Sequence, residues 1–231
     1  CIRDRDYLIK VGKYWIEEFH IDGWRLDVSD EVSHDFWKRF RKEIKSAKAD
    51  AVIIGENWHN AETFLRGDEF DSIMNYAFSK ISLDYFTKKI DAKKASDCFN
   101  MVQMRNRNQA NMMMLNLLDT HDTPRFITEI NGSRDKHLAA IALSVVYMGA
   151  NLVYYGTEIG LEGKGDPDCR RSFPWISLEK NISYLEKIKE ILSIKGQKVI
   201  RDGKIKISSK DDILLVERFD CESKLCLLYT S

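Results

Sequence analysis

The feature that most constrains this chain is a repeated alternation of short apolar runs with longer segments of helical periodicity. Residues 23–28 and 51–56 are too short for helices, and the second run is β-branched and apolar until its last residue, as in a buried parallel strand. Apolar residues recur at helical spacing over 7–19 and 32–44. Strand followed by helix, repeated about every 30–40 residues, predicts a parallel sheet with crossover helices.

The alternation continues along the chain and then stops. Further strands are expected at 70–76, 112–118 and 151–155, and further helices at 81–90, 95–104, 138–146 and 178–191. From Val199 onward the segments are short and alternating, with turn signals between them, which predicts antiparallel β-structure. We therefore expect a first domain over residues 1–197 and the beginning of a β-domain over 198–231.

Ionisable residues stand at the ends of three strand-like runs. They are Asp27, Glu56 and the pair His121 and Asp122. No Gly-x-Gly-x-x-Gly follows a strand, which argues against a dinucleotide fold. Functional groups collected from the carboxyl ends of several parallel strands are typical of a (β/α)₈ TIM barrel, so we predict part of such a barrel followed by the antiparallel β-domain.

The charge balance limits the partners. Lys and Arg number 36 and Asp and Glu number 36, so the formal charge is 36 − 36 = 0. A broad nucleic-acid or acidic-membrane binder would carry a basic surplus, and no apolar run reaches the roughly 18–20 residues of a membrane span. We expect neither nucleic acid nor membrane as a partner.

Acids at strand ends, without a His-Cys cluster or a serine elbow, point to carboxylate chemistry. Cleavage of a glycosidic bond needs a proton donor and a nucleophile or base on the other side of the sugar. Arg25 lies two residues before Asp27 and projects from the same face, so its guanidinium can orient that carboxylate. Glu56 follows an apolar strand, where desolvation favours the protonated acid. The alternative is that each acid caps a following helix.

Four segments resemble signature segments of the α-amylase family, glycoside hydrolase family 13. Residues 23–28 (GWRLDV), 55–59 (GENWH) and 118–125 (LDTHDTPR) match in the family's order. Residues 166–171 (DPDCRR), after 155–160 (YGTEIG), are similar to a stretch of the neopullulanase, cyclomaltodextrinase and maltogenic amylase branch. The resemblance implies that the chain holds barrel strands four to eight.

The resemblance also implies residue roles. Asp27 matches the nucleophile, Glu56 the general acid/base and Asp122 the third carboxylate, while Arg25 and His121 match partners that orient the nucleophile and hold the sugar. The implied reaction is a retaining double displacement, in which the two reacting carboxyl groups stand roughly 5–5.5 Å apart.

Four neighbouring residues match substrate contacts. Trp58 would stack on a glucose ring, Glu31 would influence whether water or sugar is the acceptor, and Asp166 and Arg170 would bind the non-reducing end of the substrate. The alternatives are a packed tryptophan, a helix-start acid and a surface ion pair. Residues 29–31 lack the Lys-His pair of typical α-amylases, which favours the branch with smaller substrates.

The implied function is hydrolysis of α-1,4 glucosidic bonds, with α-1,6 bonds as an open option, in cyclodextrins, pullulan or maltooligosaccharides. Transglycosylation is a second outcome. Three alternatives stay open: an α-glucosidase, a sugar-isomerising relative of the same family, and a non-catalytic glucan-binding homologue. No cofactor is identifiable. The family's remaining signature segment, its calcium sites and the N-terminal domain for a homodimer would all precede Cys1.

Smaller expectations concern cysteines, histidines and surface charge. The five cysteines are odd in number and scattered, and no leader is visible, which favours reduced thiols and a cytoplasmic protein, with a Cys221–Cys226 disulfide as the alternative. Two sets of side chains are expected at the solvated surface: His20, His34 and His137, and the outer-face residues Lys38, Arg41, Lys42 and Lys45.

Overall fold

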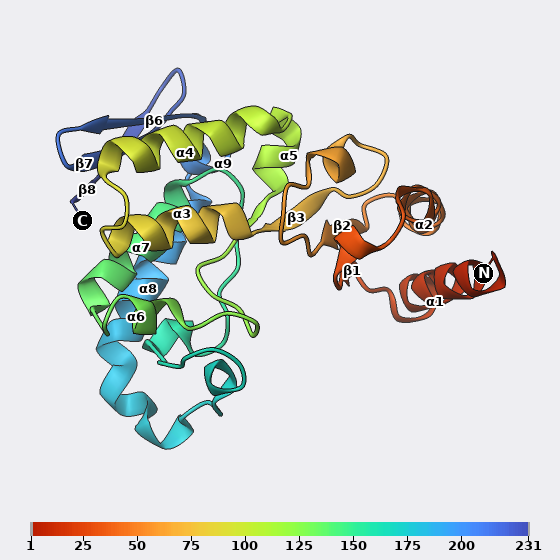
Figure 1. Cartoon of the computed structure of the whole chain (residues 1–231), viewed down its shortest axis with the longest axis horizontal. Coiled ribbons are helices and arrows are strands. Elements are labelled where there is room, and N and C mark those ends of the chain that lie inside the picture. The colour runs from red at the N-terminus through yellow and green to blue at the C-terminus, as the bar shows by residue number, and fades with distance from the viewer. Residues whose placement is uncertain (1, 231) are drawn as a thin grey trace. The chain divides into compact units, whose positions relative to one another are not determined.

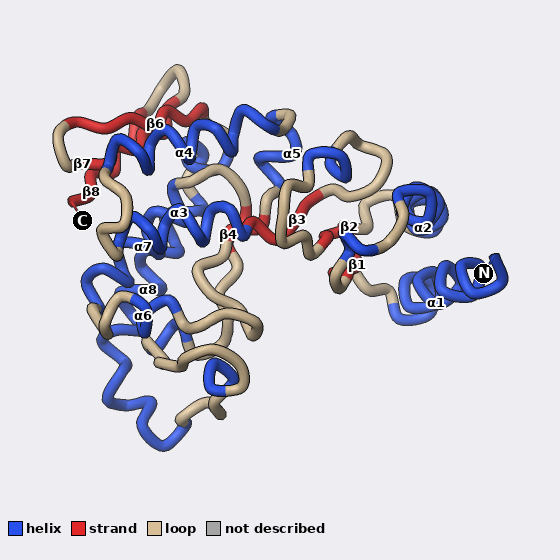
Figure 2. The backbone as a smooth tube through the Cα atoms, viewed as in Figure 1, coloured by secondary structure: helices blue, strands red, loops and turns tan. Residues whose placement is uncertain are grey.

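A computed structural model describes residues 2–230 and divides the chain into two compact units. The first unit runs up to Tyr76 and includes Arg105–Leu115, and the second consists of Ala77–Met104 and the described residues from Asn116 onward. Each unit has its own hydrophobic core. Figure 1 labels the helices and strands, and Figure 2 distinguishes them from the loops by colour.

The first unit contains the first three strands of the chain, which pair in parallel, together with helices. Its elements are α1 (Ile2–Phe19), β1 (Gly23–Leu26), η1 (Ser29–Glu31), α2 (His34–Ala47), β2 (Val52–Gly55), η2 (Glu62–Leu65), β3 (Ser72–Asn75) and α5 (Asn108–Met113). β1 pairs in parallel with β2, and β2 with β3. Gly23 is required because a Cβ at this position would lie 2.0 Å from the carbonyl oxygen of Val52.

The core of the first unit follows from the apolar spacing in α2. Phe36, Trp37, Phe40 and Ile44 recur at helical intervals and are buried. Burial of each such side chain stabilises the fold by about 1.5–3 kcal/mol. Gly12 of α1 lets the two helices approach, because a Cβ there would lie 2.6 Å from the ring of Phe40.

Asp71 connects α2 with the sheet. Its carboxylate accepts hydrogen bonds from Lys45 Nζ at 2.8 Å, Arg41 Nη1 at 2.8 Å and the backbone N–H of Ile53 at 3.0 Å. Burial alone raises the pKa of Asp71, but these donors outweigh it and hold the pKa below its ordinary value of 3.8. The expectation that Arg41 and Lys45 are merely solvated is wrong, because a half-buried carboxylate draws both cations inward.

We expect Asp71→Asn to lower the free energy of unfolding by about 1–3 kcal/mol at pH 7. The pKa is lower in the folded than in the unfolded chain, so the stabilisation is complete above about pH 4 and is lost as the pH falls through the folded-state value. Denaturant titrations should therefore show a smaller difference from wild type at pH 3. Asp68→Asn, which removes a carboxylate that is 52% exposed, is the control. An Asp71→Asn difference that did not change between pH 7 and pH 3 would contradict the prediction.

The second unit combines helices with an antiparallel sheet. Its elements, the first three of which begin or end at the unit boundary, are α3 (Tyr76–Phe86), α4 (Ala92–Arg105), β4 (Leu115–Asn116), α6 (Phe126–Glu129), α7 (Arg134–Val146), β5 (Ala150–Asn151), η3 (Thr157–Ile159), η4 (Asp168–Arg170), η5 (Trp175–Asn181), α8 (Ile182–Ser193), η6 (Ile194–Gly196), α9 (Lys198–Arg201), β6 (Lys204–Lys210), β7 (Ile213–Phe219) and β8 (Lys224–Thr230). β7 pairs antiparallel with β6 and β8, as the pattern after Val199 predicts.

Alternate residues of β7 face the core of the second unit. Leu214, Val216 and Arg218 are all buried, and the two apolar side chains join the same cluster as Phe78 of α3 and Leu143 of α7. The sheet formed by β6, β7 and β8 is therefore packed against helices of its own unit, as Figure 1 shows.

Two cations satisfy carbonyl groups at the end of α7. Arg218, 1% exposed, donates from Nη1 to the carbonyl of Val146 at 3.2 Å and from Nη2 to that of Gly203 at 2.8 Å. Lys195 Nζ donates to the carbonyl of Val145 at 3.0 Å. Positive charge is favourable at the C-terminal end of a helix. Desolvation nevertheless lowers the pKa of Lys195 to about 8.

Some elements are shorter than the sequence predicts. The run 112–118 is apolar except for Asn116, so periodicity alone does not separate helix from strand. Its first residues belong to α5, and only Leu115–Asn116 form β4. β5 ends at Asn151 instead of 155, before a turn in which Gly156 has φ +85°. The expected helix at 178–191 begins as η5 and becomes α-helical at Ile182.

The structure contradicts the expected surface position of one histidine and excludes the alternative Cys221–Cys226 disulfide. His20 and His34 are exposed as expected, but His137 is fully buried, because it lies four residues before Ile141 on the core face of α7. Its Nδ1 lies 2.6 Å from the Tyr184 hydroxyl, and desolvation lowers the pKa of His137 to about 4.

Cys98, Cys169, Cys221 and Cys226 are free thiols, so no Cys221–Cys226 disulfide forms, and Cys1 lies outside the described residues. Across residues 2–230, no helix has the length and apolarity needed to cross a bilayer.

Candidate active site

The first candidate carboxylate lies directly after β1. Asp27 is 78% exposed, and its Oδ1 lies 2.5 Å from Nη1 of Arg25, which is the expected ion pair. Arg25 lies in β1, and Asp27 is the first residue of the turn that follows the strand. Asp27 is thus both accessible to a ligand and oriented by a cation.

Glu56 lies directly after β2 in a different environment. Its side chain is 2% exposed, and Oε2 accepts the backbone N–H of Val28 at 3.0 Å. Oε1 lies 2.5 Å from Nη2 of Arg25 and accepts the hydroxyl of Tyr76 at 3.3 Å. A buried carboxyl with this set of donors has a fixed position and little contact with water.

Arg25 joins the two carboxylates. One terminal nitrogen contacts Asp27 and the other contacts Glu56, so the two acids lie close together across a single planar group. The helix-capping alternative does not hold for them, because the N-cap residues of η1 and η2, the helices that follow these two acids, are Val28 and Ala61. An accessible carboxylate beside a buried one can serve as nucleophile and proton donor, respectively.

Tyr76 belongs to this group, although the sequence analysis did not identify it. Besides its hydrogen bond to Glu56, its ring stacks on Trp58 with 4.1 Å between centroids and 14° between planes. Trp58 remains 42% exposed, so it is not a packed core residue. Tyr76 directly follows β3, just as Asp27 and Glu56 follow their strands, so the same strand-end rule would have found it.

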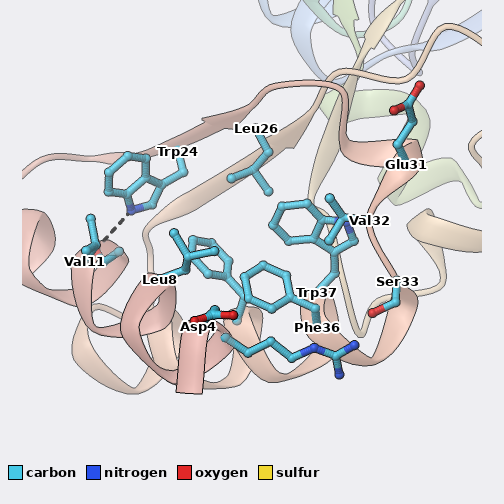
Figure 3. Close-up of a pocket in the computed structure, with 13 residues that line it drawn as sticks. Asp4, Leu8, Val11, Trp24, Leu26, Glu31, Val32, Ser33, Phe36 and Trp37 are labelled. Atoms are coloured by element: carbon cyan, nitrogen blue, oxygen red, sulfur yellow. Dashed lines mark hydrogen bonds between the residues drawn. The ribbon is translucent and has the colours of Figure 1, made fainter. Parts of the chain in front are cut away.

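Glu31 lies apart from these contacts, at the edge of a cavity of about 540 Å³. Figure 3 shows that this cavity is lined mostly by apolar side chains of α1, β1 and α2, such as Leu8, Trp24 and Phe36, while the carboxylate of Glu31 points away from them. Of the predicted site residues, only Glu31 lines it. The cavity therefore does not coincide with the two carboxylates.

The remaining predicted residues form a second group within the second unit. Asp122 Oδ2 lies 3.0 Å from His121 Nε2, and Asp122 Oδ1 lies 3.4 Å from Arg170 Nη2. Arg170 Nε also lies 3.1 Å from Asp166 Oδ1, so one guanidinium links both acids. β4 ends at Asn116, so the pair at 121–122 stands in the following loop and not at the strand end itself.

A buried acid anchors this loop. Both carboxylate oxygens of Asp119 are used: Oδ2 accepts the N–H of Phe126 at the start of α6, and Oδ1 accepts the hydroxyl of Thr157, each at 2.9 Å. Burial raises the pKa of Asp119, although these donors and the nearby Arg125 act against it. Over the described residues, no group of three or more His, Cys, Asp or Glu side chains is arranged to hold a metal ion.

Residues 3–206, most of the chain, match the family described as alpha amylase, catalytic domain. The chain belongs to the alpha-amylase family. This membership confirms the predicted fold class: the alpha-amylase chain holds the later part of a (β/α)₈ barrel, followed by the antiparallel sheet. The boundary placed at residues 197 and 198 stays a prediction.

Three relatives illustrate where this alpha-amylase chain stands. It is 43% identical over 192 residues to a cyclomaltodextrinase of Thermoanaerobacter pseudethanolicus, covering 83% of the chain and 33% of the relative. It is 41% identical over 209 residues to an intracellular maltogenic amylase of Bacillus subtilis, covering 89% and 36%. The solved cyclic alpha-maltosyl-(1→6)-maltose hydrolase of Arthrobacter globiformis superimposes with a TM-score of 0.94 at 32% identity, covering 99% and 52%. The chain thus spans about a third of the length of these two curated relatives and about half of the solved structure.

Proposed function

We propose that the whole protein is a retaining glycoside hydrolase that cleaves α-1,4 glucosidic bonds, and also α-1,6 bonds, in cyclodextrins, pullulan or maltooligosaccharides, with transglycosylation as a side reaction. The observation that carries the proposal is the position of Arg25 between Asp27 and Glu56, with 2.5 Å to each carboxylate. A retaining enzyme needs its two carboxyl groups only about 5–5.5 Å apart, and a shared guanidinium supports a short separation.

In the proposed reaction, an oxygen of Asp27 attacks the anomeric carbon and the bond to the leaving oxygen breaks. Glu56 gives its proton to that oxygen, which leaves a covalent glycosyl-Asp27 ester. Water then attacks the same carbon, its proton passes to Glu56, and the carboxylate of Asp27 is released. The exposure of Asp27 and the burial of Glu56 support this division of roles.

The other residues would bind the sugar. Asp122, held by His121 and Arg170, would accept hydrogen bonds from sugar hydroxyls, and Asp166 with Arg170 would receive the non-reducing end. The exposed face of Trp58 would stack on a glucose ring, with Tyr76 supporting its other face. Glu31 would influence the choice between water and sugar as acceptor.

The substrate class is supported by the names of the relatives. These are a cyclomaltodextrinase, a maltogenic amylase and a hydrolase of a cyclic sugar with (1→6) links. The word intracellular in the name of the second relative supports a cytoplasmic location for this protein too.

The stereochemistry of the product tests the mechanism. We expect the whole protein, incubated with β-cyclodextrin or pullulan, to release products whose new reducing end is first seen as the α-anomer by proton NMR, because two displacements retain configuration. Initial release of the β-anomer would contradict the retaining mechanism. Activity confined to terminal glucose of maltooligosaccharides would favour an α-glucosidase, and binding without turnover would favour a non-catalytic homologue.

A further inference from the structure

Arg125 is a fully buried arginine beside the second group of site residues. It stands immediately before α6, and its side chain is 0% exposed. Nε donates to the carbonyl of Cys169 at 2.9 Å and Nη1 donates to the carbonyl of Tyr155 at 2.7 Å. The guanidinium also lies 4.0 Å from the centroid of the Tyr154 ring, within the range of a cation–π contact.

These contacts connect three segments that are distant in the chain. Arg125 ends the segment that carries His121 and Asp122, while Tyr155 lies in the turn after β5 and Cys169 lies in η4. The backbone N–H of Arg125 donates to a fourth point, the carbonyl of Gly163, at 2.8 Å. Arg125 thus forms hydrogen bonds with both ends and with the middle of the segment 155–169.

The same segments meet again at His121. Its carbonyl accepts hydrogen bonds from Cys169 Sγ at 3.1 Å and from Arg170 Nε at 2.9 Å. Arg170 in turn reaches the carboxylates of Asp122 and Asp166. The place of Arg170 between these two acids therefore depends on how η4 packs against the loop that carries His121. Arg125 makes hydrogen bonds between the same two segments from the buried side.

A desolvated guanidinium is costly, and an apolar side chain could fill the same space. The guanidinium of Arg125 lies in the interior, and its Nη2 has no hydrogen-bond partner among the described atoms. Its two side-chain hydrogen bonds go to the backbone carbonyls of Tyr155 and Cys169, which would lose these donors if the guanidinium were removed. These features favour a residue selected for what it holds in place and not for apolar packing.

We propose that Arg125 is a positioning residue that fixes η4 against the Asp122 loop, so that Arg170 can serve Asp122 and Asp166 together. Arg125 does not touch these acids and acts through the backbone of Cys169. The effect on catalysis rests on the proposed function, whereas the effect on the loop does not.

The thiol of Cys169 provides a readout of loop position that needs no activity. Cys169 is fully buried in the wild-type protein, whereas Cys221 and Cys226 are exposed and serve as internal references. We expect Arg125→Gln to raise the rate at which iodoacetamide alkylates Cys169 by about tenfold or more, because two hydrogen bonds from a charged donor are lost. Peptide mass spectrometry measures the alkylation of each cysteine over time. Arg125→Lys should give an intermediate rate, because one ammonium group cannot reproduce the fork of a guanidinium.

Arg134→Gln is the matched control. It removes another guanidinium that lies over a tyrosine, 4.8 Å from the ring centroid of Tyr184, but contacts neither segment. Its Cys169 rate should equal that of wild type. An unchanged Cys169 rate in folded Arg125→Gln would overturn the proposal. If Arg125→Gln does not fold, Arg125→Lys decides, and a wild-type rate in that variant would overturn it equally.

Steady-state kinetics of the whole protein test whether Arg125 also affects substrate binding and turnover. We expect Arg125→Gln to raise KM for maltooligosaccharides about tenfold and to lower kcat less, because Asp166 and Arg170 are proposed to hold the substrate, while Arg134→Gln leaves both constants unchanged. A KM equal to that of wild type despite faster Cys169 labelling would overturn the catalytic role. If the wild-type protein hydrolyses no glucan, the proposed function fails while the labelling result still judges the positioning role.

Discussion

Replacing Asp27 by asparagine or Glu56 by glutamine should each reduce kcat of the whole protein on maltooligosaccharides by about 10³-fold or more. Asparagine cannot form the glycosyl ester, and glutamine has no proton to give to the leaving oxygen, although both keep the shape of the side chain. Initial rates of reducing-sugar release measure the effect. Full activity in either variant would contradict the assigned roles.

The two variants can be told apart by the leaving group. A maltosyl fluoride releases fluoride without protonation, so Glu56→Gln should retain the first step on this substrate whereas Asp27→Asn should not. Asp30→Asn and Glu62→Gln are the matched controls, because these acids lie in η1 and η2 just after the catalytic candidates but outside their contacts. If the fluoride were cleaved equally slowly by both catalytic variants, Glu56 would not be the proton donor.

Replacing Arg218 by methionine should lower the free energy of unfolding by about 3 kcal/mol. The two carbonyl groups that its guanidinium satisfies, of Val146 and Gly203, would remain buried without donors, at about 1–3 kcal/mol each. An apolar replacement can offset the loss of a buried ion pair, but here the partners belong to the backbone and cannot be removed with the charge.

Denaturant unfolding measures this loss, with Arg201→Met as its control. Arg201 is 63% exposed and pairs with Asp202 at the surface, so its replacement should change the free energy of unfolding by less than about 1 kcal/mol. Equal losses in the two variants would show that the buried hydrogen bonds of Arg218 do not carry the effect.

The sequence predicted the parts of the fold that depend on local pattern. β1, β2 and α2 were found because strand length and helical spacing are visible over a few residues, and Asp27 and Glu56 followed from their places at strand ends. The strand expected at 112–118 was wrong for most of its length, because a mostly apolar run is compatible with a helix and with a strand.

Contacts between distant segments left no local signal. Arg125 belongs to the motif at residues 118–125, but nothing near it in the chain shows that its partners are the carbonyls of Tyr155 and Cys169. The helical context of His137 predicts a surface position, although its spacing from Ile141 marks it as a core position. Tyr76 is the last residue of the expected strand 70–76, but nothing near it in the chain shows that it contacts Glu56 and Trp58.

The packing of β7 has a consequence for recombination between relatives. Its inward side chains Leu214 and Val216 share a core with α7, and Arg218 supplies donors to the end of that helix. A chimera joined between α9 and β6 would combine a helix end from one parent with the donor and the apolar partners of another. Exchange of this sheet among family members therefore requires α7 and β7 to be inherited from the same parent.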